Sequence, residues 1–365
     1  DRNNYSIAIG YNAFTSSGDS SSNGNLAVGE NARAVGGQTV AVGSKAAALG
    51  DQSSAFGNNT VALGDGSIAF GGDDTLKKQY KDSSGNLIYY GRKGSGIGIN
   101  GDTVDYYRPT LSYGTGANAI GVHAQALAQG ATAIGAGATA GAATGVLYKT
   151  DVKGIITSYS ITSTSGENST ALGSLSTAIG DRSTAIGAFA TSVSTDSVAI
   201  GADSSANARS IAEGVGARAT GSNAITMGYY SAASGNNSIA IGDKSAVGGA
   251  NSLSLGTGNI VSGSNSGAIG DPSVISGDNS YSLGNNNTIA TSASNSFVIG
   301  NNVNAIAANS VYLGANATAA TASGSATAGT ESYNQTTIGS TYYGTFAGAT
   351  PAGVVTVGSA AGGER

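Results

Sequence analysis

Hydrophobic and polar residues alternate along this chain in short segments that end on a glycine, and this glycine returns every seven residues. One unbroken series consists of Gly242, Gly249, Gly256, Gly263, Gly270, Gly277 and Gly284. Two segment types alternate in it: a tight type, S-x-[AS]-[IL]-G, as in Ser238–Gly242, and a looser type, as in Asn259–Gly263. The true repeat is therefore fourteen residues long, and a repeat of this regularity predicts a solenoid.

Each repeat predicts a strand, a two-residue turn, a second strand and a second turn. Five extended residues span about 17 Å, and the helical spacing of apolar residues is absent. We therefore expect a flat parallel β-roll of roughly 20 turns, on the order of 100 Å long at the strand spacing of parallel sheets. The pairs Asp243-Lys244 and Asp271-Pro272 are of turn-forming types. We expect every closing glycine to adopt the positive φ that other residues avoid.

The apolar positions within the segments predict an oligomer. In the tight type the fourth position is large and apolar (Ile241) and the third is small (Ala240), which would allow another backbone to approach closely. In the looser type both positions two and three are apolar (Ile260 and Val261), and adjacent residues point to opposite faces. One of each pair fills the thin interior, and the other contacts water or a neighbour. Apolar rows of this length favour a closed ring of parallel rolls, most simply a C3 homotrimer, over a monomer with one wet face.

Two insertions interrupt the repeats. Their hydrophobic and basic stretches flank glycine turns, which predicts hairpins, and Tyr and Arg are residue types that anchor interfaces. The hairpins would either bind a ligand or only cover apolar surface and lock subunits together. The expected organisation is β-roll repeats at 1–71, a Tyr/Lys-rich hairpin insertion at 72–116, repeats at 117–141, a second hairpin insertion at 142–168, repeats at 169–314, and irregular repeats leading to the start of a neck at 315–365.

The basic and aromatic residues of these insertions are the candidate adhesive surface. They are Lys77, Lys78, Tyr80, Lys81, Tyr89, Tyr90, Arg92, Lys93, Tyr106, Tyr107, Arg108, Tyr148, Lys149 and Tyr159.

Composition excludes several other functions. The 365 residues include 59 Gly, no Cys and a single His, so disulfides and thiolate metal sites are excluded and His123 alone would have to support a catalytic triad. No cofactor or metal site is expected. A net charge of −5 argues against a nucleic-acid partner. No apolar run is long enough to span a membrane, and the chain reads as a fragment of a longer protein. A paired-carboxylate glycosidase stays possible, but no segment favours it.

The repeated segments Ser238–Gly242, Ser183–Gly187 and Ser197–Gly201 resemble the YadA-like head repeat of trimeric autotransporter adhesins. The segment 354–365 is similar to the start of that family's head-to-neck junction. The resemblance implies a left-handed parallel β-roll, with three chains forming one head. It also implies exposure on the outer membrane of a Gram-negative bacterium, through a C-terminal anchor absent from this sequence. The implied role is attachment to host matrix proteins, host cells, other bacteria or abiotic surfaces.

Three functions are therefore weighed. The first is a non-enzymatic adhesive head that binds through many weak contacts. The second is an ice- or carbohydrate-binding solenoid, because Thr170, Thr177 and Thr184 recur every seven residues; we expect that position to face the interior. The third is a β-helical enzyme acting on polysaccharide, which the shortage of catalytic residue types disfavours.

Overall fold

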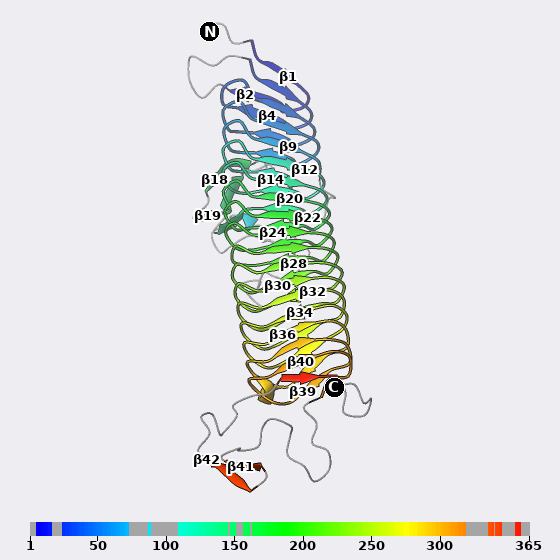
Figure 1. The fold of residues 1–365 in the computed structure, drawn as a ribbon. Helices are drawn as coiled ribbons and strands as arrows, with labels where there is room; N and C mark the ends of the chain where they lie inside the picture. Colours follow the sequence, from blue (N-terminus) through cyan, green and yellow to red (C-terminus); the bar gives the residue numbers. More distant parts are fainter. Residues whose placement is uncertain are drawn as a thin grey trace. The chain divides into compact units, whose positions relative to one another are not determined.

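A computed structural model describes residues 5–16, 24–72, 87–88, 109–144, 147–150, 156–160, 163–318, 335–338, 340–344 and 355–358. The chain divides into an N-terminal unit, Asp1–Ala206, and a C-terminal unit, Asn207–Arg365, and each is described by itself. Within each unit, short strands stack in parallel into two sheets, called sheet A and sheet B (Figure 1). Sheet A is formed by the tight segments and sheet B by the looser ones.

The N-terminal unit contributes ten strands to each sheet among its described residues. Sheet A comprises β1 (Ile7–Ile9), β3 (Leu26–Val28), β5 (Val40–Val42), β7 (Ser54–Phe56), β9 (Ile68–Phe70), β12 (Asn118–Ile120), β14 (Thr132–Ile134), β20 (Thr170–Leu172), β22 (Thr184–Ile186) and β24 (Val198–Ile200). Sheet B comprises β2 (Phe14–Ser16), β4 (Arg33–Val35), β6 (Ala47–Ala48), β8 (Val61–Ala62), β11 (Leu111–Ser112), β13 (Gln125–Ala126), β15 (Thr139–Ala140), β21 (Thr177–Ala178), β23 (Thr191–Ser192) and β25 (Ser205–Ala206).

The C-terminal unit repeats this arrangement. Sheet A comprises β26 (Ile211–Glu213), β28 (Ile225–Met227), β30 (Ile239–Ile241), β32 (Leu253–Leu255), β34 (Gly267–Ile269), β36 (Tyr281–Leu283), β38 (Phe297–Ile299), β40 (Val311–Leu313) and β43 (Val355–Val357). Sheet B comprises β27 (Arg218–Ala219), β29 (Ala232–Ala233), β31 (Ala246–Val247), β33 (Ile260–Val261), β35 (Val274–Ile275), β37 (Thr288–Ile289) and β39 (Asn304–Ala305).

The remaining elements lie outside the two sheets. A short 3₁₀ turn, η1 (Thr291–Ala293), lies between β37 and β38. The other strands are β10 (Leu87–Ile88), β16 (Ala142–Thr144), β17 (Leu147–Thr150), β18 (Ile156–Ser160), β19 (Ser163–Ser165), β41 (Gln335–Ile338) and β42 (Thr341–Gly344).

Equivalent positions of the repeat stack on one another. In the C-terminal unit Ile239 pairs with Leu253 and Ile241 pairs with Leu255, in parallel. The backbone N–H of Ile239 donates to the carbonyl of Ser252 at 2.9 Å, and this bond recurs from turn to turn. The predicted all-β parallel solenoid with about fourteen residues per turn is confirmed.

The interior of each unit is thin. In the N-terminal unit it consists of fully buried alanines such as Ala178 and Ala185. In the C-terminal unit, sheet B contributes larger side chains, and Val261 and Ile275 are both 0 % exposed. Their sequence neighbours point outward, and Ile260 is 50 % exposed. The prediction that one member of each apolar pair fills the interior is confirmed.

The second position of the tight segment lies on the outside of the roll, not the inside. Thr170 and Thr184 are only half-buried, whereas the next residues, Ala171 and Ala185, are fully buried. The expectation that this position is interior is therefore wrong. The small third position faces the interior, so the backbone that approaches it is that of the facing sheet. The two sheets lie so close together that the small residue fits between them, and strand alternation then turns both larger neighbours outward.

Both kinds of closing glycine approach the backbone of the next turn closely, but only one kind also has a positive φ. Those that close tight segments have the predicted left-handed backbone, with φ of 131° at Gly242 and 134° at Gly256. Those that close looser segments, such as Gly249 and Gly263, do not, so the expectation of positive φ at every glycine is wrong. A Cβ placed on Gly263 would lie 2.7 Å from the carbonyl carbon of Gly277 in the next turn. Glycine is needed there because two backbones approach closely.

The turns are tied to one another by side-chain ladders. In the C-terminal unit Asn237 donates from Nδ2 to Oδ1 of Asn251 at 3.1 Å, and Asn251 donates in the same way to Asn265 at 3.2 Å. These asparagines adopt the left-handed conformation, which Asn tolerates better than most residues. The ladder leaves the turn amides satisfied along one edge of the unit. Its described members are Asn223, Asn237, Asn251, Asn265, Asn279, Asn295 and Asn309.

Candidate adhesive surfaces

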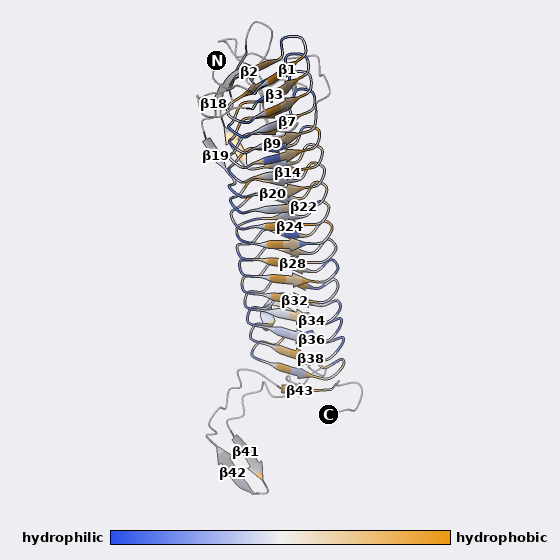
Figure 2. Cartoon of the chain, turned by 90° about the horizontal axis from the view of Figure 1, so that it is seen from above, coloured by the Kyte–Doolittle hydropathy of each residue, from blue (hydrophilic) through white to orange (hydrophobic). Residues whose placement is uncertain are grey.

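The outward side of sheet A in the C-terminal unit is an apolar face, formed by the second and fourth positions of the tight segments. Leu255 and Leu283 of its fourth-position row are 44 % and 47 % exposed. Figure 2 shows the hydrophobic strands bordered by hydrophilic turns. Large exposed apolar patches mark sites that contact a protein, a membrane or a ligand. The fourth-position row consists of Glu213, Met227, Ile241, Leu255, Ile269, Leu283, Ile299, Leu313 and Val357.

The N-terminal unit has a row of the same kind. Phe56 and Phe70 stack in neighbouring turns with their ring centroids 6.0 Å apart, and Phe70 is 56 % exposed. The row consists of Ile9, Val28, Val42, Phe56, Phe70, Ile120, Ile134, Leu172, Ile186 and Ile200.

All eleven candidate site residues of the first insertion lie outside the described residues. They are Lys77, Lys78, Tyr80, Lys81, Tyr89, Tyr90, Arg92, Lys93, Tyr106, Tyr107 and Arg108.

The candidate residues of the second insertion lie on an antiparallel strand pair. Tyr148 and Lys149 belong to β17 and Tyr159 belongs to β18, and Tyr148 is the register partner of Tyr159. Leu87 of β10, which comes from the first insertion, also pairs with Tyr148. The three strands form one antiparallel sheet in the order β10-β17-β18. The backbone therefore joins the two insertions to each other, which the sequence analysis did not anticipate.

The outward side of sheet B carries a covered apolar patch near these insertions. Val61 and Leu111, which are register partners, are 1 % and 2 % exposed although they point away from the interior. Ala143 of β16, in the second insertion, packs against this patch. Covering the roll is therefore one function of that insertion. The patch consists of Ala47, Val61, Leu63, Leu111 and Leu127, with Leu49, Tyr113 and Ala143 packed on it.

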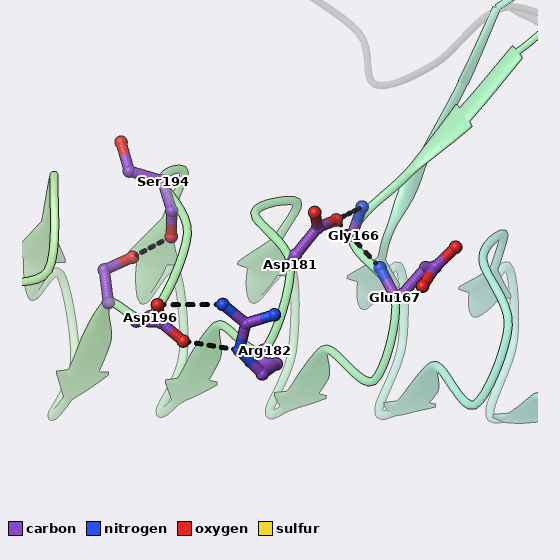
Figure 3. Close-up of polar contacts among 7 residues, drawn as sticks. Gly166, Glu167, Asp181, Arg182, Ser194 and Asp196 are labelled. Carbon is purple, nitrogen blue, oxygen red and sulfur yellow. Dashed lines mark hydrogen bonds and ion pairs between the residues drawn. The ribbon is translucent and has the colours of Figure 1, made fainter.

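The second insertion rejoins the roll at a hydrogen-bonded turn (Figure 3). The Asp181 carboxylate accepts from the backbone N–H of Gly166 at 2.7 Å and of Glu167 at 3.1 Å. Arg182, the residue after Asp181, donates from Nε and Nη2 to the two carboxylate oxygens of Asp196 in the next turn, at 2.6 and 2.9 Å. These hydrogen bonds, with the charge of Asp196, raise the pKa of the Arg182 guanidinium above its ordinary value. The two-pronged contact fixes the turn that follows the insertion.

A second exposed cluster was missed by the sequence analysis. Tyr229 and Tyr230 form the turn between β28 and β29 and are 50 % and 56 % exposed. Their rings meet edge to face, with centroids 4.5 Å apart and an interplanar angle of 85°. Lys244 Nζ in the next turn lies 5.9 Å from the centroid of Tyr229. Two adjacent aromatic residues in a turn position otherwise occupied largely by small or polar residues were the available sequence signal.

The family model of the YadA head domain repeat matches the chain at residues 26–46, 48–73, 112–138, 165–190 and 219–245. The chain carries YadA head domain repeats. Such repeats are typical of trimeric autotransporter adhesins, so the resemblance seen in the sequence is confirmed. The YadA head is a non-enzymatic adhesin module, and the family implies a surface-exposed outer-membrane adhesin. No curated protein matches the chain.

The described parts of the chain contain no group of three His, Asp or Glu residues that could hold a metal ion. His123 lies in a turn with φ of 61°. Within the same described residues, no helix has the length and hydrophobicity needed to cross a membrane.

Proposed function

We propose that this chain forms the adhesive head of a homotrimeric adhesin on the outer membrane of a Gram-negative bacterium. Each protomer is a left-handed β-roll, and three protomers pack side by side through the apolar face of sheet A. The observation that supports this most is the register-aligned row of exposed large apolar residues on that face, exemplified by Leu255 and Leu283. YadA-family adhesins are homotrimers, which agrees with an apolar face that needs a partner.

The proposed head attaches by multivalent contacts to host matrix proteins, host cells, other bacteria or abiotic surfaces. Three copies of each outward surface on one trimer convert weak single contacts into firm attachment. The second insertion, which carries Tyr148, Lys149 and Tyr159, is a candidate contact surface, together with the basic and aromatic residues between 77 and 108. Tyrosine supplies an anchoring ring at low entropic cost, and the basic residues add charge.

Light scattering after size exclusion tests the assembly. The chain is expected to have a mass of three times 35.2 kDa over a range of concentrations. Leu255→Asp places a charge on the apolar face and is expected to give monomers, because three buried carboxylates would face one another without partners. Ile260→Asp is the matched control, since Ile260 is equally exposed but lies on sheet B. A trimer with Leu255→Asp, or monomers with both variants, would contradict the proposed packing.

Adhesion is then measured with the trimer and with the Leu255→Asp variant on coated matrix proteins, bacterial cells and glass. The proposal expects the monomer to lose binding by much more than threefold, because avidity depends on simultaneous contacts. Equal binding per chain would show that the head does not act multivalently.

A further inference from the structure

We propose that Tyr229, Tyr230, Asp243 and Lys244 form a binding site for a neutral hexopyranose unit of a surface glycan. The inference rests on the proposed adhesive function and names the ligand class for one of its contact surfaces. All four residues lie in two successive turns on the edge of the C-terminal unit that connects sheet A to sheet B.

The backbone at this site is unusual for the residue that it carries. Tyr230 has φ of 49°, in the left-handed region. Gly216 holds the equivalent position one turn before, with φ of 68°, and Asn286 holds it further along, with φ of 55°. Glycine and asparagine tolerate this conformation, whereas a bulky aromatic residue is disfavoured there. Leu175 and Phe189 adopt the same conformation at the equivalent turn position of the N-terminal unit, with φ of 56° and 60°, so the repeat imposes it. At Tyr230 this turn presents a ring that is 56 % exposed.

The ring of Tyr230 packs against Gly216 of the preceding turn. A Cβ on Gly216 would lie only 2.8 Å from Cδ1 and Cε1 of Tyr230. The ring therefore lies directly over the backbone of the preceding turn, which has room for it only because residue 216 is glycine. Tyr229 stands across it at 85°. The two rings form a preformed corner that loses little side-chain entropy when a ligand binds.

Polar groups for sugar hydroxyls stand beside the rings. Lys244 Nζ lies 3.9 Å from Asp243 Oδ2, which is longer than a hydrogen bond, and the two side chains are 67 % and 44 % exposed. The ammonium group can therefore donate to one hydroxyl while the carboxylate accepts from another. The electron-rich face of a tyrosine ring attracts the slightly positive C–H groups on the face of a pyranose.

The size and charge of the site favour a saccharide over a protein. The tyrosine and lysine turns span about 10 Å at the parallel strand spacing, and the following turn carries only Thr257 and Gly258. A protein partner needs roughly 800 Å² on each side, far more than two turns provide. The paired charges of Asp243 and Lys244 cancel, which suits a neutral sugar better than an acidic one.

The test is a glycan array of neutral and acidic saccharides probed with the full chain, followed by titration of the best-bound neutral glycan. Tyr230→Asn is the main variant, because asparagine is native to this turn position at Asn286 and keeps the fold. Its affinity is expected to fall at least tenfold, whereas Tyr230→Phe retains the ring and stays within about threefold of the parent protein. Tyr342→Ala removes a tyrosine that is 64 % exposed elsewhere and should leave affinity unchanged.

Three outcomes would overturn the inference: no neutral glycan bound on the array, neutral-glycan binding unchanged in Tyr230→Asn, or a change of molar mass in that variant. The last would make the ring a contact between subunits. Loss of adhesion to matrix proteins without any glycan binding would likewise assign the patch to a protein ligand. If the parent head still adheres in any of these cases, the proposed adhesive function is retained and only the glycan site is refuted. Failure of the glycan site can therefore be told apart from failure of the adhesive function.

Discussion

Two adjacent glycines, Gly248 and Gly249, should respond in opposite ways to substitution by alanine. Neither has a left-handed φ, so alanine can adopt both backbone conformations. A Cβ on Gly248 would meet only Ser234 Oγ, at 3.9 Å, and the position is exposed. A Cβ on the buried Gly249 would lie 2.5 Å from the carbonyl carbon of Gly263 and still closer to its oxygen.

The magnitude follows from the contacts that must open. Alanine at 249 forces the neighbouring turn away, which strains the bonds from Gly248 N–H to Val261 O (2.8 Å) and from Asn265 N–H to Ala250 O (2.9 Å). Each is worth about 1 kcal/mol net, and overpacking adds about 1–3 kcal/mol. Alanine also lowers the conformational entropy of the unfolded chain, which stabilises the folded state by about 0.4–1 kcal/mol. The free energy of unfolding should thus fall by about 2–5 kcal/mol in Gly249→Ala, whereas in Gly248→Ala it should stay unchanged or rise by up to about 1 kcal/mol.

The assay is urea unfolding of the full chain at fixed protein concentration, because association shifts apparent stability. Amide hydrogen exchange locates the damage, and faster exchange is expected near residues 249–265 in Gly249→Ala, since a solenoid loosens locally. Equal unfolding midpoints for the two variants, or a larger loss in Gly248→Ala, would refute the argument from close backbone approach.

Two further substitutions test the ladder and the covered patch by the same urea assay. Asn251→Ala should lower the free energy of unfolding by about 1–3 kcal/mol, because it removes the bonds with Asn237 and Asn265 and forces alanine into φ of 53°. Asn251→Gly should lower it less, and equal losses would show that backbone strain has no effect. Leu63→Ala should lower the free energy of unfolding by about 2–5 kcal/mol, because the side chain is 2 % exposed in the patch on which Ala143 of the second insertion packs. Ile260→Ala, at an outward position that is 50 % exposed, should change little in comparison, and similar losses would argue against a covered patch.

The sequence by itself determined the repeat, its strands and its turns. A period of fourteen residues stacks each position on its own equivalent, so the register of Ile239 on Leu253 follows from counting alone. The asparagines of the ladder in the C-terminal unit, such as Asn251, mark a left-handed backbone that Asn tolerates better than most residues. The same count places Gly216, Tyr230 and Lys244 in successive turns, although the angle between the rings of the turn does not follow from it.

Only the tertiary structure decided which side of each strand is buried. Strand alternation places Thr184 and Ala185 on opposite faces but does not say which one faces inward. Alanine faces inward because the gap between the two sheets is narrow. The two requirements on glycine also separated only in three dimensions: Gly249 and Gly256 both approach the backbone of the next turn closely, but only Gly256 also has a positive φ. The pairing of Leu87 with Tyr148 joins segments far apart in sequence, and such a contact leaves no local signal because it depends on where the roll presents both insertions.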